Sequence, residues 1–230
     1  MKQGALAALS EEIADCRACP RLVRWREEVA RVKRRAYREW EYWGRPVPGF
    51  GDPRPGGLYV LGLAPGAHGA NRTGRMFTGD GSGDFLYSAL HRAGIASRPE
   101  SHSRDDGLKL RGAFISNAAR CVPPGNRPEP EELRRCAPFL DRELALLRPR
   151  VIFALGAIAW GAALGAVERA GHELPRPRPR FAHGGSWTPE GGPSVVGCYH
   201  VSRQNTQTGR LTAAMFDEVL ARALALRTSP

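Results

Sequence analysis

The run LYVLGL at residues 58–63 decides the fold. It is short, apolar and rich in strand-forming residues, and it leads through a glycine-rich loop into an amphipathic segment at residues 83–93. The same alternation then repeats to the end of the chain. We expect strands over 112–116, 151–155 and 194–199, and helices over 130–147, 157–170 and 211–226. Buried strands that alternate with helices predict an α/β fold with a parallel, doubly wound sheet.

The segment before this core divides into two parts. Residues 10–43 carry apolar side chains at three- and four-residue steps, which predicts a helix with arginines on its other side. That helix either covers the core with a solvated basic face or contacts DNA directly. Residues 44–57 hold four prolines and five glycines, so we expect an irregular linker. One domain over 1–230 follows, with a cysteine-bearing part (1–43), the linker (44–57) and an α/β core (58–230).

Four cysteines have the spacing of a ligand set. Cys16 and Cys19 form a CxxC pair, and Cys121 and Cys136 follow about a hundred residues later, with fourteen residues between them. The second pair is too widely spaced for a zinc knuckle, so a 4Fe–4S cluster is the leading interpretation. Disulfides and scattered buried thiols remain alternatives. Cys198 lies in an apolar run and is predicted to be a core residue.

The charge balance favours nucleic acid as a partner. The formal net charge is +11, and only Lys2, Lys33 and Lys109 among the 34 basic residues are lysines. Arginine suits phosphate contacts. GC-rich coding or growth at high temperature would give a similar composition. No segment is long and apolar enough for a signal peptide or a membrane span, so we expect a cytoplasmic monomer without a membrane partner.

Three loops follow the predicted strands, at the edge where parallel sheets bind ligands. The first, GLAPGAHGANRTGRMFTGDGSGD at residues 62–84, matches neither a P-loop nor a GxGxxG fingerprint. The second, SNAARCVPPGNRP at residues 116–128, delivers an amide and then Cys121. The third, CYHVSRQNTQTGRLT at residues 198–212, places a histidine at a strand end.

Together, the cysteines and these three loops resemble family 5 uracil-DNA glycosylases, the cluster-containing type of thermophilic bacteria, archaea and mycobacteria. The resemblance covers most of the chain, in order. It implies a three-layer α/β/α fold around a four-stranded parallel sheet. It also implies a structural 4Fe–4S cluster held by Cys16, Cys19, Cys121 and Cys136, and excision of uracil and other deaminated bases from double-stranded DNA.

The resemblance also assigns roles at the strand ends. Phe77 would stack on the extruded base, in a pocket that includes Gly62 and Ala64. Asn117 offers a donor and an acceptor to a pyrimidine edge. His200 would stabilise the charge that develops on the departing base. The alternatives are that Phe77 is an ordinary core residue, that Asn117 only forms a turn, and that His200 is a surface or core residue without a catalytic role.

Water activation is less defined, because residues 63–67 lack the acidic or amide side chain that several related families use there. Asp80 is a candidate, and helix capping is its rival role. A pocket lined by alanine and glycine would also accept hypoxanthine or xanthine.

Two segments are expected to contact the duplex. Arg203, Gln204 and Asn205 form a candidate wedge for the vacated space, and Pro123 and Pro124 would position phosphates. A catalytically silent DNA-binding module and a uracil-specific family 4 glycosylase remain alternatives.

Overall fold

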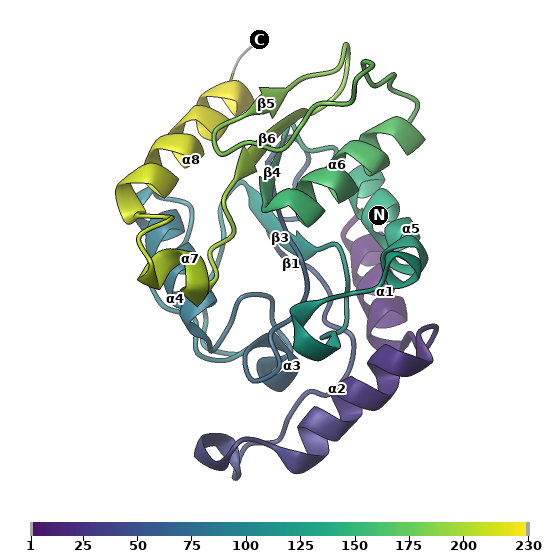
Figure 1. The fold of residues 1–230 in the computed structure, drawn as a ribbon, viewed down its shortest axis with the longest axis vertical. Coiled ribbons are helices and arrows are strands. Elements are labelled where there is room, and N and C mark those ends of the chain that lie inside the picture. Colours follow the sequence, from purple (N-terminus) through teal and green to yellow (C-terminus); the bar gives the residue numbers. More distant parts are fainter. Residues whose placement is uncertain (1, 229–230) are drawn as a thin grey trace.

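The computed structural model describes residues 2–228 and has helices on both faces of a central sheet (Figure 1). The helices are α1 (Lys2–Asp15), α2 (Pro20–Val32), α3 (Ala70–Thr73), α4 (Gly81–Arg92), α5 (Pro130–Leu147), α6 (Ala157–Arg169), α7 (Arg203–Gln207) and α8 (Ala213–Thr228), with 3-10 turns η1 (Arg35–Tyr37) and η2 (Pro124–Asn126). The strands are β1 (Phe50–Gly51), β2 (Leu58–Gly62), β3 (Ala113–Asn117), β4 (Val151–Leu155), β5 (Ser186–Trp187) and β6 (Ser194–Cys198). No helix in this part of the chain is long and apolar enough to cross a bilayer.

The α/β fold is confirmed, and the sheet is larger than predicted. Its strand order is β1-β3-β2-β4-β6-β5, and the four inner strands are parallel. Two-residue antiparallel strands, β1 and β5, extend it at the edges. The inner strands are buried at every position, which is why they appear in the sequence as continuous apolar runs.

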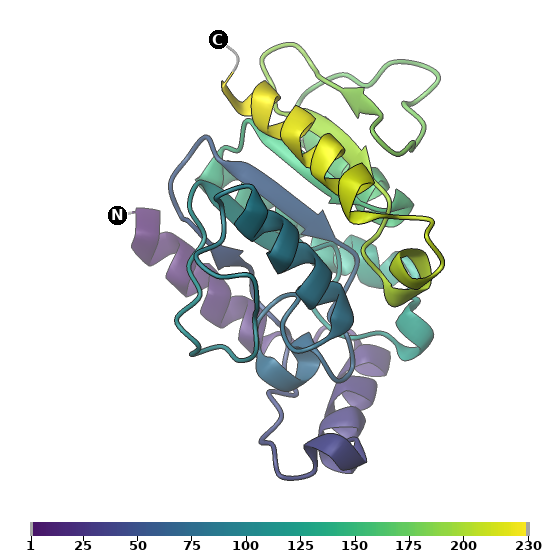
Figure 2. The same cartoon turned by 90° about the vertical axis from the view of Figure 1, so that its left-hand side faces the viewer.

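The strands separate two hydrophobic cores because successive side chains point to opposite faces. Val60 and Phe153 pack with α4 and α8 on one face, whereas Tyr59 and Ile152 pack with α5 and α6 on the other. Figure 2, a quarter turn from Figure 1, shows α4 and α8 side by side over the sheet. Cys198 belongs to the first core, as predicted.

The prediction of one helix over residues 10–43 is wrong. The chain leaves the helical path around Cys16 and Cys19, and α2 ends at Val32, where Lys33 takes a φ of 57°. Leu22 and Val29 are buried, but Val32 and Trp40 are exposed. The apolar periodicity continues beyond Val29 without a core to pack against.

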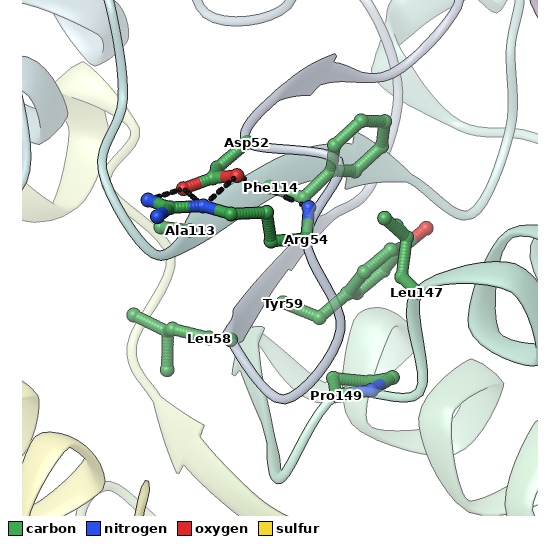
Figure 3. A pocket seen from close by; sticks show the side chains of 9 residues that line it. Asp52, Arg54, Leu58, Tyr59, Ala113, Phe114, Leu147 and Pro149 are labelled. Atoms are coloured by element: carbon green, nitrogen blue, oxygen red, sulfur yellow. Dashed lines mark hydrogen bonds and ion pairs between the residues drawn. The ribbon is translucent and has the colours of Figure 1, made fainter. Parts of the chain in front are cut away.

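The segment 44–57 is also more ordered than a linker. It contains β1, and the Val47 amide donates to the Arg120 carbonyl. Figure 3 shows Asp52 and Arg54 at a small cavity at the start of β2 and β3. Asp52 accepts from Arg54 and from the Gly112 amide, and these hydrogen bonds hold its pKa well below the ordinary range. The segment is therefore fixed to the edge of the sheet.

A buried ion pair joins α5 to the sheet. Arg120 donates two hydrogen bonds to the Glu143 carboxylate, at 3.0 and 2.8 Å. Both side chains are 1% exposed. Arg120 also donates to the Ser116 hydroxyl on β3, and the Tyr59 hydroxyl donates to Glu143. Breaking such a pair leaves a charge in a low dielectric without compensation.

We expect Glu143→Gln to lower the free energy of unfolding by about 3 kcal/mol or more, because it leaves the Arg120 charge buried and unpaired. Urea unfolding followed by circular dichroism measures this change. The control is Glu12→Gln, which breaks the exposed pair with Arg142 between α1 and α5. Equal midpoints for the two variants would contradict the prediction.

Candidate active site and cysteine cavity

The carboxyl ends of the inner strands bring the predicted residues to one edge. Gly62 ends β2 directly opposite Asn117, the last residue of β3. The Gly156 amide, just after β4, donates to the Cys198 carbonyl at the end of β6. A Cβ on Gly156 would stand 3.3 Å from the Cβ of His200. The four inner strands β3, β2, β4 and β6 therefore place Asn117, Gly62, Gly156 and His200 along one edge of the sheet.

Asn117 presents an unpaired acceptor in this site. The side chain is 1% exposed, and its Nδ2 donates to the Met76 sulfur at 2.9 Å. Its Oδ1 is buried and has no hydrogen-bond partner within residues 2–228. A Cβ on Gly62 would collide with this oxygen and with the Phe77 ring. The glycine at residue 62 therefore lets the ring and the amide approach the backbone of β2.

Phe77 lies between the two strand-end residues. Its ring centroid is 6.5 Å from that of His200. The backbone has a φ of 51°, a left-handed conformation that a bulky residue rarely adopts, so the surroundings must enforce it. The Tyr87 hydroxyl donates to the Met76 carbonyl, and a Cβ on Gly83 would collide with the Phe77 carbonyl. The ring is thus held in place from α4.

A buried arginine network fixes the residues next to Phe77. Arg75 donates to Thr78 Oγ1, Ser101 Oγ and Asp106 Oδ2, the last two at 2.6 Å. Despite burial, hydrogen bonds from Arg75 and three backbone amides hold the pKa of Asp106 well below the ordinary range. The site loop is therefore rigid where it carries Phe77.

His200 is a neutral imidazole near pH 7, because burial lowers its pKa below the ordinary value of 6.5. Neither ring nitrogen makes a hydrogen bond to the described residues. The Asn205 amide donates to the His200 carbonyl at 2.8 Å. The ring is therefore positioned through its backbone while a nitrogen stays available.

Asp80 caps α4 and also reaches the first loop. Its Oδ1 accepts from the amides of Ser82 and Gly83 at 3.0 and 3.1 Å, so the capping role is present. Its Oδ2 lies against Gly66 and Gly69, where a Cβ would collide with it. Burial raises the pKa of Asp80 above 3.8. One carboxylate oxygen is thus engaged in capping, and the other faces the loop after β2.

The remaining predicted site residues differ in their exposure to solvent. Ala64 is half-buried in the loop after β2. The candidate wedge is the short helix α7, where Arg203 and Gln204 are exposed. Asn205 is not at its tip, because it turns back to the His200 carbonyl. Pro123 is buried beside half-buried Pro124, so the surface there belongs to residues 125–127.

The four cysteines meet in a second place. Cys16, Cys19, Cys121 and Cys136 line one cavity between α2, α5 and the loop after β3. Burial raises the pKa of the Cys121 thiol to about 12 and those of Cys19 and Cys136 above the usual value. No group of three or more His, Cys, Asp or Glu side chains in the described residues is arranged to hold a single metal ion.

Arg26 brings a positive charge to this cavity. It is 2% exposed and donates to Cys121 Sγ at 3.0 Å and to the Cys16 carbonyl. Glu27, 3.9 Å away, is exposed and already pairs with Arg17. Arg26 Nε is buried without a partner in this part of the chain. A buried guanidinium without a close buried carboxylate fits an anionic group held by the thiols. The sequence pattern predicted no role for Arg26, because burial of an arginine depends on partners that are distant in the chain, such as Cys121.

Comparison with known proteins agrees with the geometry. The profile of the family described as Uracil DNA glycosylase superfamily matches residues 48–224. A type-5 uracil-DNA glycosylase of Thermus thermophilus is 53% identical over 94% of this chain and 95% of the relative. One of Mycobacterium bovis is 52% identical, over 96% and 81% respectively, and one of Pyrobaculum aerophilum is 45% identical, over 93% and 89%.

A type-4 uracil-DNA glycosylase of Pyrobaculum aerophilum is 33% identical over 74% of the chain. The type-5 relatives are thus more similar and cover more of the chain. The chain belongs to the uracil-DNA glycosylase superfamily and, within it, to the type-5 enzymes.

Proposed function

We propose that this DNA repair enzyme extrudes a uracil nucleotide from duplex DNA and hydrolyses its N-glycosidic bond, leaving an abasic site. The observation that carries the proposal is an unpaired Asn117 Oδ1 at the end of β3 and unpaired ring nitrogens of His200 after β6, on one edge of the sheet with the Phe77 ring between them. A protein that only binds DNA has no need for two such groups around one buried point. Membership of the type-5 enzymes supports the same reaction.

Asn117 would recognise the base through its carbonyl oxygen. Uracil presents an N–H between two carbonyl groups, and this donor would satisfy the buried acceptor. Cytosine carries no hydrogen on the corresponding nitrogen, so it would leave the buried Oδ1 without that donor. Phe77 would supply an aromatic surface for stacking against the base.

His200 would act as the hydrogen-bond donor to the base as the bond breaks. The electron pair of the bond between base and sugar passes to the base, and the sugar becomes an oxocarbenium ion. Charge then accumulates on the base oxygens, where a neutral imidazole N–H stabilises it without giving up its proton. The lowered pKa of His200 fits this role, because burial favours the neutral ring over the charged one.

Asp80 would position the water that captures the sugar cation. Its Oδ2 is the oxygen not used for capping, and it faces the glycines after β2. Water adds to the anomeric carbon and its proton passes to the carboxylate. A proton then returns to the base anion, so the products are neutral base and abasic DNA. Capping and water positioning use different oxygens and are compatible.

The substrate range would extend to hypoxanthine and xanthine. Both carry the same N–H next to a carbonyl group that would pair with Asn117 Oδ1, whereas adenine does not. Glycine or alanine at residues 62, 64, 66 and 156 keeps the walls of the site small. We propose that the enzyme works as a monomer, with Arg203 and Gln204 of α7 entering the duplex.

We further propose that the four cysteines hold a structural 4Fe–4S cluster. Their thiolates would ligate the irons, and Arg26 would balance the negative charge of the cluster. Four thiols around one cavity would suit an iron–sulfur cluster, which cysteine thiolates hold in proteins. Hydrolysis requires no electron transfer, so the cluster would serve to join α2 to the segment 121–136.

His200→Ala should slow single-turnover excision of uracil from a duplex about a hundredfold or more, because one donor to the charged base is lost. The dissociation constant for DNA should change little. The control is His172→Ala. His172 lies just after α6 and contacts the Glu190 carbonyl, so it is not one of the residues of the site. Unchanged excision in His200→Ala would refute the assignment, and no excision by the unaltered protein would refute the proposed reaction.

Asp80→Asn should retain the cap and lower the excision rate by roughly ten- to a thousandfold, because an amide cannot take the proton of water. The raised pKa of Asp80 gives the rate an acidic limb. As pH falls through that pKa, the carboxylate gains a proton and the rate drops. Rate–pH profiles should show this limb in the unaltered enzyme and in the control Asp84→Asn, but not in Asp80→Asn. A near-native rate would leave capping as the sole role.

Purified protein should be brown, with a broad absorbance on the order of 400 nm from thiolate-to-iron charge transfer. Arg26→Met should lower the iron content and this absorbance, because a positive charge beside the thiolates is lost. Arg24→Met, an exposed arginine of the same helix, should not. A colourless protein with stoichiometric zinc would contradict the cluster, and equal iron content in both variants would contradict the role of Arg26.

A further inference from the structure

A charged segment outside the active site extends from the end of α2. Residues 33–43, which we name the basic arm, carry Lys33, Arg34, Arg35 and Arg38 against two glutamates. In Figures 1 and 2 the arm projects at the lower end of the molecule, beneath α3. Neither the proposed chemistry nor the cysteine cavity uses it.

The arginines of the arm form no ion pair within residues 2–228, although two glutamates lie in the same segment. Arg34, Arg35 and Arg38 are exposed, and their side chains make no hydrogen bond or ion pair there. Exposed arginines elsewhere do form pairs, such as Arg92 with Asp217 and Arg142 with Glu12. Three like charges within five residues repel one another, so the arm is suited to an anionic partner.

The arm is fixed to the site loop through Arg72. The guanidinium carbon of Arg72 lies 4.0 Å from the ring centroid of Tyr37 and 4.1 Å from that of Trp40. Arg72 is 4% exposed and donates to the carbonyls of His68 and Gly79. Cation–π contacts thus hold the arm, and hydrogen bonds hold the loop, to one side chain.

Further contacts make the attachment rigid. The Trp43 amide donates to the Arg72 carbonyl, and the Tyr42 hydroxyl lies 3.1 Å from His68 Nδ1. A Cβ on Gly74 would meet the Trp43 ring at 3.0 Å. The arm is therefore positioned relative to the loop that carries Phe77 and Asp80.

The site loop also touches the candidate wedge at its other end. A Cβ on Gly81, next to Asp80, would stand 3.3 Å from side-chain carbons of Arg203. The loop thus contacts α7 near Asp80 and the basic arm near Arg72. Duplex DNA extends beyond the extruded nucleotide, so a ligand seated over the site would continue over its flanks.

We propose that the basic arm binds backbone phosphates of the duplex flanking the extruded nucleotide, with Arg34, Arg35 and Arg38 as the contacts and Arg72 as the positioning residue. The inference rests on the proposed glycosylase function and adds a second DNA-binding surface to it. Arginine forks match phosphate oxygens, and rigid attachment lowers the entropy lost on binding. Such contacts hold the enzyme on any sequence.

The test compares two triple variants with the same loss of charge. R34A/R35A/R38A removes the arm contacts, and R176A/R178A/R180A removes three exposed arginines from the loop at the opposite end of the molecule (Figure 1). Fluorescence anisotropy measures the dissociation constant for a duplex with an abasic-site analogue between 50 and 200 mM salt, a range over which phosphate contacts dominate.

The arm variant should bind DNA at least about tenfold more weakly. The slope of log affinity against log salt concentration should be less negative by about 2–3, because each lost phosphate contact changes it by about 0.9. Excision at saturating enzyme should stay within about threefold of the unaltered rate. Affinity and slope equal to those of the control would overturn the proposal. Failure of the proposed function itself would appear separately, as no excision by the unaltered protein.

A second variant tests the attachment. Y37L/W40L removes both rings around Arg72 and keeps every charge of the arm. If attachment matters, affinity should fall by several-fold while the salt slope stays near that of the unaltered protein, because the phosphate contacts still form after an extra loss of entropy. An unchanged affinity would remove Arg72 from the proposal and leave the arm as a flexible binder.

Discussion

The arrangement depends on the buried ion pair of Arg120 and Glu143. Glu143 lies on α5, the helix that carries Cys136, and Arg120 precedes Cys121 and bonds to Ser116, the neighbour of Asn117. One desolvated guanidinium therefore stands between the cysteine cavity and the end of β3. Because such a charge tolerates little displacement, the position of α5 and that of the carboxyl end of β3 are determined together.

Much of the fold was predictable because the inner strands are buried on both faces. The continuous apolar run predicted the strand 151–155, and the amphipathic pattern predicted the helix 130–147, both with their observed bounds. The errors lie where the same signal is missing or misleading. The edge strands β1 and β5 are two residues long, too short for any periodicity, and the apolar stripe beyond Val29 continues into the exposed arm.

The site was predictable where topology alone places a residue. Asn117 and His200 follow parallel strands, so a shared edge brings them together. The sequence did not indicate that three arginines are buried, namely Arg26, Arg72 and Arg75. An arginine is buried only where partners from elsewhere in the chain compensate its charge. Asp106 lies 31 residues beyond Arg75, and no local pattern reports that pairing. Asn205 was misplaced for a different reason: its amide donates to the His200 carbonyl five residues earlier, so the side chain turns away from the tip of the loop.

The left-handed Phe77 has a consequence for hydration. Its ring already lies against Gly62 and the Asn117 amide, and both are buried, so the resting acceptor is shielded from bulk solvent. Little of the surface of Phe77 and Asn117 therefore remains for an entering base to remove from solvent. The heat-capacity change of DNA capture would therefore come mainly from the flanking duplex surfaces, and the pocket itself would contribute chiefly enthalpy.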